Sequence, residues 1–213
     1  MCLASTSPAR LMLLRQAGIE PLIIAPAVDE DAASAAAAEE RGAALAPEEL
    51  VLLLARAKAA DVAGRIQDEH PDFDGIVIGG DSMFAIGGEV HGKPYTPEAA
   101  RERWQRMRGA TGILHSGHSV FRVAPGTGPV EATAVAEAAV SFADDVTDAE
   151  LEAYIASGEP LHVAGAFTVD SLGGAFITRV EGDPSTVVGM SLSTLRRLAG
   201  ELGVVWTDLW SRP

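Results

Sequence analysis

A short run of β-branched residues, followed by two glycines and an aspartate, constrains the fold of this chain more than any other stretch. The run covers residues 76–78 (Ile-Val-Ile), and Gly79, Gly80 and Asp81 come directly after it. Consecutive β-branched residues favour a central strand that is buried on both faces. We predict that this strand stops at the glycines, where a ligand or another segment approaches the backbone closely.

Asp81 is a candidate site residue, because ligands of open α/β sheets collect at the carboxyl ends of the strands. Lys93 follows after a turn, so the two side chains can form a compact pair of opposite charges. An aspartate that only ends the strand explains the same stretch about equally well.

The composition is that of an ordinary globular protein. The chain has 213 residues, of which 47% are hydrophobic and 22% charged, so it can bury a sizeable core as one α/β domain or two small lobes. Its formal net charge of −14 argues against a nucleic-acid polymer or an anionic membrane as partner, because the field of the protein repels both. A small phosphorylated ligand needs only a local basic pocket and is still allowed.

Cysteine usage and hydropathy predict a cytoplasmic protein. Cys2 is the only cysteine, which excludes an internal disulfide and fits a reducing cytosol. No apolar run reaches membrane-spanning length, and the N-terminus shows no secretory pattern.

The first 25 residues predict a strand, a helix and a second strand. Ser7 stands at the N-cap position and Pro8 at the first helical position. The turn from Ser5 to Ser7 therefore leads into a helix N-terminus that favours an anion, and Arg10 can add a two-pronged contact to phosphate. The alternative, which these residues alone favour, is that Ser7 only caps the helix and Arg10 is solvated.

Two helical segments are predicted next. The alanine-rich residues 32–46 are helix-prone, and we expect a mobile excursion that can serve as a lid. Pro47 begins a long helix, on which Lys58 lies between apolar residues one turn away on either side. A lysine on such a face either snorkels to water, the commoner outcome, or reaches into a pocket.

The second half of the chain is predicted to be mostly scaffold. Thr96 and Thr147 stand at the N-cap positions of two further helices. A long antiparallel hairpin is predicted over residues 117–142, and two short strands over 166–169 and 175–180.

His115 and His118 flank the entry to the hairpin. Two histidines three residues apart are a weak signal for a metal site. Because no third ligand stands nearby, we expect exposed turn histidines instead.

Four sequence blocks stand in order along the chain: LASTSPAR (3–10), GGDSM (79–83) with HGKP (91–94), YIASGEPLHVAGAF (154–167) and EGDPSTVVGM (181–190). Together they resemble the Maf family of nucleoside triphosphate pyrophosphatases. The resemblance runs from Leu3 to about Leu195, and four ordered blocks are far more specific than any one of them. We therefore expect residues 1–213 to form a single Maf-like domain.

The resemblance implies an α/β fold similar to that of inosine triphosphatases. The expected architecture is a mixed, elongated β-sheet flanked by helices, with two lobes around a cleft. The implied reaction is hydrolysis of nucleoside triphosphates, including non-standard or modified ones, to the monophosphate and pyrophosphate. A divalent metal, Mg²⁺ or Mn²⁺, and a homodimer are implied as well.

The resemblance also assigns roles to individual residues. The general base of the family falls on Asp81. Its substrate-binding positions fall on serines, lysines and an arginine: Ser5, Ser7, Arg10, Lys58, Ser82 and Lys93. Its acidic position after the second strand falls on Glu30, and we expect Glu30 and Asp81 to hold the metal.

Three positions depart from the family branch that prefers dTTP and UTP. That branch has an arginine where this chain has Ala9, a threonine at Ser82 and a glutamine at Asp170. The base preference is therefore left open, whereas the phosphate chemistry is less affected.

Two other functions compete with hydrolysis. One is a non-catalytic nucleotide sensor or partner-binding regulator of cell division, a role to which the family has also been linked; it predicts nucleotide binding without pyrophosphate release. The other is phosphoryl transfer through an aspartyl-phosphate, which is weaker because Met83 stands where a second aspartate would follow Asp81.

Overall fold

Short strands and helices alternate in the first part of the chain, and three long strands follow. The structure, a computed structural model, describes residues 1–211. The strands are β1 (Cys2–Ala4), β2 (Leu22–Ile23), β3 (Gly75–Ile86), β4 (Glu89–His91), β5 (Thr111–Val123), β6 (Val130–Phe142) and β7 (Ile177–Gly182). The α-helices are α1 (Pro8–Gln16), α2 (Glu30–Arg41), α3 (Pro47–Glu69), α4 (Pro97–Met107), α5 (Asp148–Ala156), α6 (Pro184–Val188) and α7 (Leu192–Glu201). The short 3₁₀ helices are η1 (Glu159–His162), η2 (Ala164–Ala166), η3 (Leu172–Phe176) and η4 (Trp206–Leu209).

All seven strands belong to one mixed sheet. Its order is β2-β1-β3-β5-β6-β7, and β4 pairs with β3 outside this path. β1 is parallel to both β2 and β3, whereas β4 is antiparallel to β3 and β7 is antiparallel to β6. The predicted α/β fold with a mixed sheet and flanking helices is confirmed.

The chain divides into two compact units. Unit 1 consists of Met1–Asp81, Ser116–Ala136 and the segment from Gly189 onward, and unit 2 of Ser82–His115 and Glu137–Val188. The strands β3, β5 and β6 therefore contribute residues to both units. A single domain over residues 1–213 stays a prediction.

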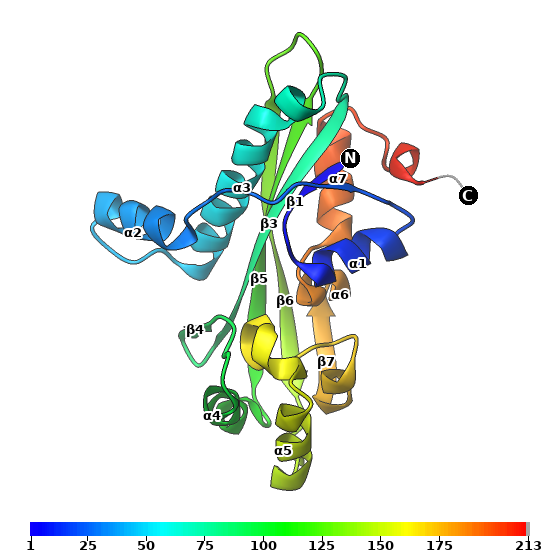
Figure 1. The fold of residues 1–213 in the computed structure, drawn as a ribbon. Coiled ribbons are helices and arrows are strands. Elements are labelled where there is room, and N and C mark those ends of the chain that lie inside the picture. The colour runs from blue at the N-terminus through cyan, green and yellow to red at the C-terminus, as the bar shows by residue number, and fades with distance from the viewer. Residues whose placement is uncertain (212–213) are drawn as a thin grey trace. The chain divides into compact units, whose positions relative to one another are not determined.

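In unit 1, helix α3 packs on the parallel strands, and Figure 1 shows it running beside β3 and β5. A cluster of buried apolar side chains from α3 and the strands forms the core: Cys2, Ala4, Ile24, Val62, Ala63, Ile66, Val77 and Val123. Burial of this kind contributes about 25 cal/mol for each Å² of apolar surface, so it holds α3 against the sheet.

Two glycines let α3 come unusually close to the sheet. A Cβ atom at Gly79 would lie 2.4 Å from the carbonyl oxygen of Ala55, and one at Gly117 would lie 2.2 Å from that of Val51. β3 does not stop at the glycines but continues to Ile86. The predicted strand end is therefore wrong, because Gly79 serves the approach of the helix rather than a turn.

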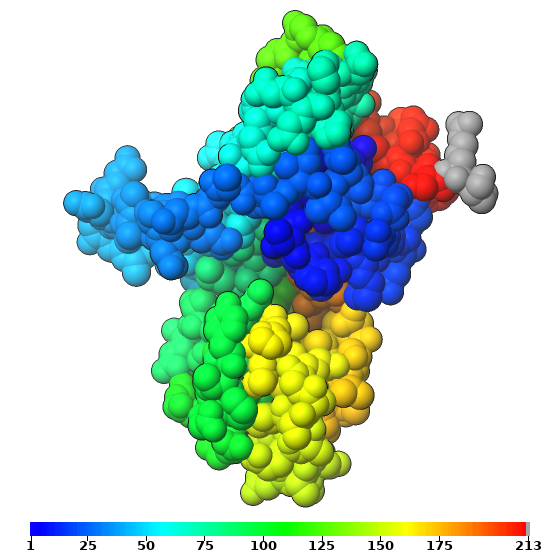
Figure 2. Space-filling view, in the orientation of Figure 1, coloured from blue at the N-terminus to red at the C-terminus, as the bar shows by residue number. Residues whose placement is uncertain are grey.

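The alanine-rich residues 32–46 were expected to be helical, and helix α2 covers them as far as Arg41, where Gly42 in the left-handed conformation ends it. None of its residues is buried, and the helix projects from the rest of unit 1 (Figure 2). Its use as a mobile lid stays a prediction.

The two histidines are not exposed turn residues. Both lie within β5, where His115 and His118 are 7% and 0% exposed. His118 Nε2 accepts a hydrogen bond of 2.8 Å from the backbone N–H of Ser191, the N-cap residue of α7. The prediction was wrong because β5 begins at Thr111, well before the residue where the hairpin was expected to start.

The predicted strand over residues 166–169 is also wrong. That stretch begins at the last residue of the 3₁₀ helix η2 and contains no strand, whereas the second predicted strand corresponds to β7. The extended hairpin strands β5 and β6 are present.

Unit 2 has an aromatic core around Trp104 of α4. The ring makes edge-to-face contacts with Phe142 and Tyr154 at centroid distances of 5.5 and 5.7 Å. Its Nε1–H donates a 2.8 Å hydrogen bond to the carbonyl oxygen of Ala166. This donor is therefore satisfied, which a buried indole requires.

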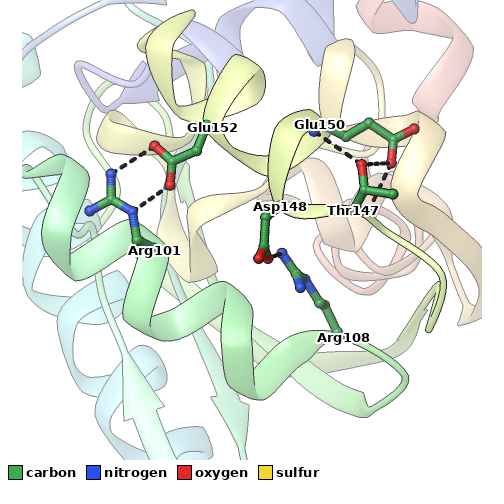
Figure 3. Close-up of polar contacts among 6 residues, drawn as sticks. All are labelled: Arg101, Arg108, Thr147, Asp148, Glu150 and Glu152. Atoms are coloured by element: carbon green, nitrogen blue, oxygen red, sulfur yellow. Dashed lines mark hydrogen bonds and ion pairs between the residues drawn. The ribbon is translucent and has the colours of Figure 1, made fainter.

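Helices α4 and α5 begin as their sequences predict and are joined at the surface by ion pairs. Thr96 and Thr147 accept hydrogen bonds from the backbone of the first helical turn. Arg101 and Arg108 pair with carboxylates of α5 (Figure 3). None of the helices within residues 1–211 combines the length and the apolar character needed to cross a membrane.

Replacement of Gly79 by alanine tests the close approach of α3. The new Cβ would clash with the backbone of Ala55 and Ala59, so Gly79→Ala should lower the free energy of unfolding by about 1–3 kcal/mol. The control is Gly64→Ala on the same helix, where a Cβ meets nothing within 4 Å and better helix propensity should raise that free energy by up to about 1 kcal/mol. Urea denaturation measures both, and equal stability of Gly79→Ala and the unchanged protein would contradict the packing described above.

Candidate functional site

The register between β1 and β3 brings the N-terminal serine turn beside Asp81. Ala4 pairs with Gly79 in this parallel ladder. Ser5, which follows the end of β1, therefore lies beside Gly80, which follows Gly79 on β3. The turn expected to bind an anion thus follows a strand that neighbours the one carrying the expected general base, both within unit 1.

The serine turn is held by its own hydrogen bonds. Ser5 Oγ, which is buried, accepts a hydrogen bond from the backbone N–H of Ser7 at 3.1 Å and one from Arg10 Nη1 at 3.4 Å. Ser7 Oγ accepts a weaker bond of 3.5 Å from the backbone N–H of Arg10 and caps α1. The predicted cap is confirmed.

Arg10 is buried rather than solvated, with 9% exposure. Its Nε donates a 3.0 Å hydrogen bond to the carbonyl oxygen of Gly189. A Cβ at Gly80 would lie 3.3 Å from this nitrogen, so the glycine makes room for the guanidinium. Burial lowers the pKa of Arg10, and the negative charges of Asp81 and Glu30 oppose that shift. The guanidinium therefore lies within the field of both carboxylates.

Lys58 joins the two predicted metal ligands. Its Nζ lies 2.8 Å from Asp81 Oδ1 and 2.9 Å from Glu30 Oε1. Lys58 and Asp81 are almost fully buried, at 7% and 8% exposure, whereas the side chain of Glu30 is half exposed. Lys58 is therefore buried in ion pairs, and the snorkelling alternative is wrong.

The position of Lys58 follows from the packing of α3. Lys58 lies three residues after Ala55, the residue whose carbonyl faces Gly79. Asp81 lies two residues after Gly79 and so points to the same face of β3. The close contact between helix and strand therefore brings the ammonium group to the carboxylate.

The charges of this group balance within unit 1. Two cations, Arg10 and Lys58, face two carboxylates, Asp81 and Glu30. Asp81 is bound to Lys58 through Oδ1, and its Oδ2 makes no hydrogen bond with any residue of the described part of the chain. One carboxylate oxygen of Asp81 is thus anchored, and the other can accept a proton.

Two predicted site residues belong to unit 2. Ser82 follows Asp81 on β3 and is half-buried, and Lys93 is exposed between β4 and α4. The structure thus brings six predicted residues together in unit 1: Ser5, Ser7, Arg10, Glu30, Lys58 and Asp81. The carbonyl of Gly189 was missed, although Gly189 lies within the last of the four sequence blocks, because a backbone acceptor cannot be recognised from residue type.

The carboxylates of Glu30 and Asp81 fit a hard divalent cation. One oxygen of each carboxylate contacts the ammonium group of Lys58, so the two carboxylates already stabilise a positive charge between them. Mg²⁺ prefers oxygen ligands and is usually bound by one or two carboxylates together with substrate phosphates and water. No group of three or more metal-binding side chains occurs among residues 1–211, so the protein itself offers a partial ligand set.

Comparisons with known proteins agree on one family. The family described as "Maf-like protein" matches residues 1–202. A protein of Leifsonia xyli subsp. xyli is 62% identical over 210 residues, which cover 99% of this chain and 96% of that protein. Proteins of Nocardia farcinica and Rhodococcus jostii are 49% and 50% identical and cover 100% and 98% of this chain, and 97% and 95% of their own lengths. All three are named "Nucleoside triphosphate pyrophosphatase".

Removal of the Lys58 cation tests the ion group. Lys58→Met leaves the buried Asp81 without its partner, so we expect the free energy of unfolding to fall by roughly 3 kcal/mol. The double variant with Asp81→Asn should recover part of this loss. Arg197→Met removes an exposed pair with Glu201 and should cost at most about 0.5 kcal/mol. If urea denaturation gave the same loss of unfolding free energy for Lys58→Met and Arg197→Met, the buried pair would stabilise the fold no more than the exposed one.

Proposed function

Because this chain belongs to the Maf-like family, we propose that it hydrolyses nucleoside triphosphates to the nucleoside monophosphate and pyrophosphate. The observation that carries the proposal is the ion group in which Lys58 contacts both Asp81 and Glu30 near Arg10. The names of relatives up to 62% identical, nucleoside triphosphate pyrophosphatases, support the same reaction class.

The chain must bind a substrate that carries about four negative charges. In this proposal the serine turn and the N-terminus of α1 bind phosphate through backbone N–H groups and hydroxyls. Lys58 contributes a third N–H beyond the two that face Asp81 and Glu30. Ser82 and Lys93 add further substrate contacts.

The ion group of Arg10, Lys58, Asp81 and Glu30 carries no net charge, so additional cations are needed to bind the phosphates. Glu30 and Asp81 would hold Mg²⁺ or Mn²⁺, which when bound neutralises phosphate charge beside the carboxylates. Lys58 orients the two carboxylates through its ion pairs before the substrate arrives.

Asp81 is the general base in this proposal. Its Oδ1 is fixed by Lys58, and its Oδ2 takes the proton of the attacking water. A P–O bond then forms to the water oxygen while the bond to the leaving group breaks. Attack on the α-phosphorus expels pyrophosphate and attack on the β-phosphorus expels the monophosphate, so both routes give the same products.

The substrate range, location and assembly belong to the same proposal. We propose that non-standard or modified nucleotides are included, and the departures of Ala9, Ser82 and Asp170 from the dTTP/UTP pattern leave the base preference open. A cytoplasmic location is supported by the single cysteine. A homodimer follows from the family resemblance alone.

The reaction is tested by pyrophosphate release from a panel of common and modified nucleoside triphosphates. We expect release with Mg²⁺ or Mn²⁺ and its loss when a chelator removes the metal. Nucleotide binding without pyrophosphate release under any of these conditions would reject hydrolysis and favour the sensor.

Replacement of Asp81 by asparagine tests the general base. Asp81→Asn keeps the size of the side chain but removes its proton-accepting carboxylate, so turnover should fall by about 10²–10⁴-fold. The control is Asp148→Asn, which changes an exposed carboxylate of α5 and should leave turnover unaltered. Thermal unfolding checks that both variants are folded, and unchanged turnover in folded Asp81→Asn would remove Asp81 from this role.

A further inference from the structure

Arg103 differs from its neighbours on and beside α4 in having no acidic partner. Arg101 pairs with Glu152 at 2.5 Å, Arg108 pairs with Asp148 at 2.6 Å, and Arg106 pairs with two glutamates at 2.5 Å. Two of these pairs are visible in Figure 3. Among residues 1–211, no carboxylate lies within ion-pair distance of Arg103. The protein carries a net charge of −14, so an unpaired arginine in unit 2 is unexpected.

The guanidinium of Arg103 is tied to the segment that carries Lys93. Its Nη1 donates a 2.5 Å hydrogen bond to the carbonyl oxygen of Gly92, the residue immediately before Lys93. The same oxygen accepts a 3.3 Å hydrogen bond from the backbone N–H of Gly165, which fixes its position. A guanidinium has five N–H donors, and within the described chain Arg103 uses only this one side-chain hydrogen bond.

The surroundings of Arg103 disfavour its charge. The side chain is partly buried, and burial together with the nearby charge of Arg106 lowers its pKa. Burial also lowers the pKa of His91, and the positive charge of Arg103 adds to that shift. Lys93 has no ion-pair partner in the described chain either. An anion that entered here would offset the cost of burying part of the Arg103 guanidinium without a counter-charge.

We propose that Arg103 and Lys93 form an anion site of unit 2 that binds phosphate oxygens of the triphosphate substrate and of the pyrophosphate product. Arg103 supplies a planar fork that suits two phosphate oxygens, and Lys93 supplies a point charge. The identity of the anion rests on the proposed hydrolysis of nucleoside triphosphates.

Binding of inorganic pyrophosphate tests this site. Calorimetry at constant Mg²⁺ would compare the unchanged protein with Arg103→Gln and with the matched control Arg101→Gln, whose arginine is paired on the same helix. Loss of a charge-assisted phosphate contact should raise the Kd of Arg103→Gln about tenfold and leave Arg101→Gln unchanged. Arg103→Lys keeps the positive charge but loses the planar fork of donors, so its Kd for pyrophosphate should lie between those of the unchanged protein and Arg103→Gln. The dependence of pyrophosphate affinity on salt should also weaken in Arg103→Gln, which loss of a structural contact alone would not cause.

The outcomes separate this site from the reaction. Unchanged pyrophosphate affinity in folded Arg103→Gln would overturn the anion site while leaving hydrolysis intact. If Arg103→Gln does not fold, the folded Arg103→Lys decides, and an unaltered Kd there overturns the site. If the protein releases no pyrophosphate from nucleotides yet binds pyrophosphate through Arg103, the reaction is wrong and the anion site stands.

Discussion

The contact between α3 and the sheet sets the position of the charged group in unit 1. The helix can lie this close to β3 and β5 only because Gly79 and Gly117 lack side chains, since a Cβ at either would overlap backbone atoms of α3. Lys58 and Asp81 each follow that contact by two or three residues and so face one another. A steric feature of the packing thereby determines an electrostatic one.

The ion group is stable because each buried charge has an opposite charge beside it. Lys58 contacts Asp81 and Glu30, and the field of both carboxylates also reaches Arg10. A buried ion pair adds little net stability compared with apolar side chains of similar size, so packing alone does not explain why it is kept. In the proposed reaction the group serves to orient Asp81 and to receive phosphate. Because the charges of this group cancel, the proposed reaction calls for a further cation, which a metal ion held by Glu30 and Asp81 would supply.

Local signals in the sequence predicted the helices well, and glycines misled the prediction of strands. Ser7, Thr96 and Thr147 were recognised as caps because a cap depends only on the residues of one turn. A glycine that ends a strand and a glycine that admits a neighbouring helix look the same in the sequence. For this reason β3 was predicted to end at Gly79, although it runs through that residue.

The site could be predicted only in part, for a related reason. Lys58 and Asp81 lie 23 residues apart, and periodicity alone favoured a solvated lysine. The family resemblance supplied the association that local patterns could not. The separation of α4 arginines into paired and unpaired ones, which identifies Arg103, depends wholly on tertiary contacts.

The glycine contact also determines where this chain can change in length. A helix turns by about 100° for each residue, so one residue inserted between Ala55 and Lys58 would swing the ammonium group away from β3 while the apolar contact stayed in place. An insertion within the exposed residues 42–44, between α2 and α3, would not rotate Lys58 relative to Ala55 and can therefore be accommodated. Natural variation in chain length should therefore gather in that connection and spare the middle of α3.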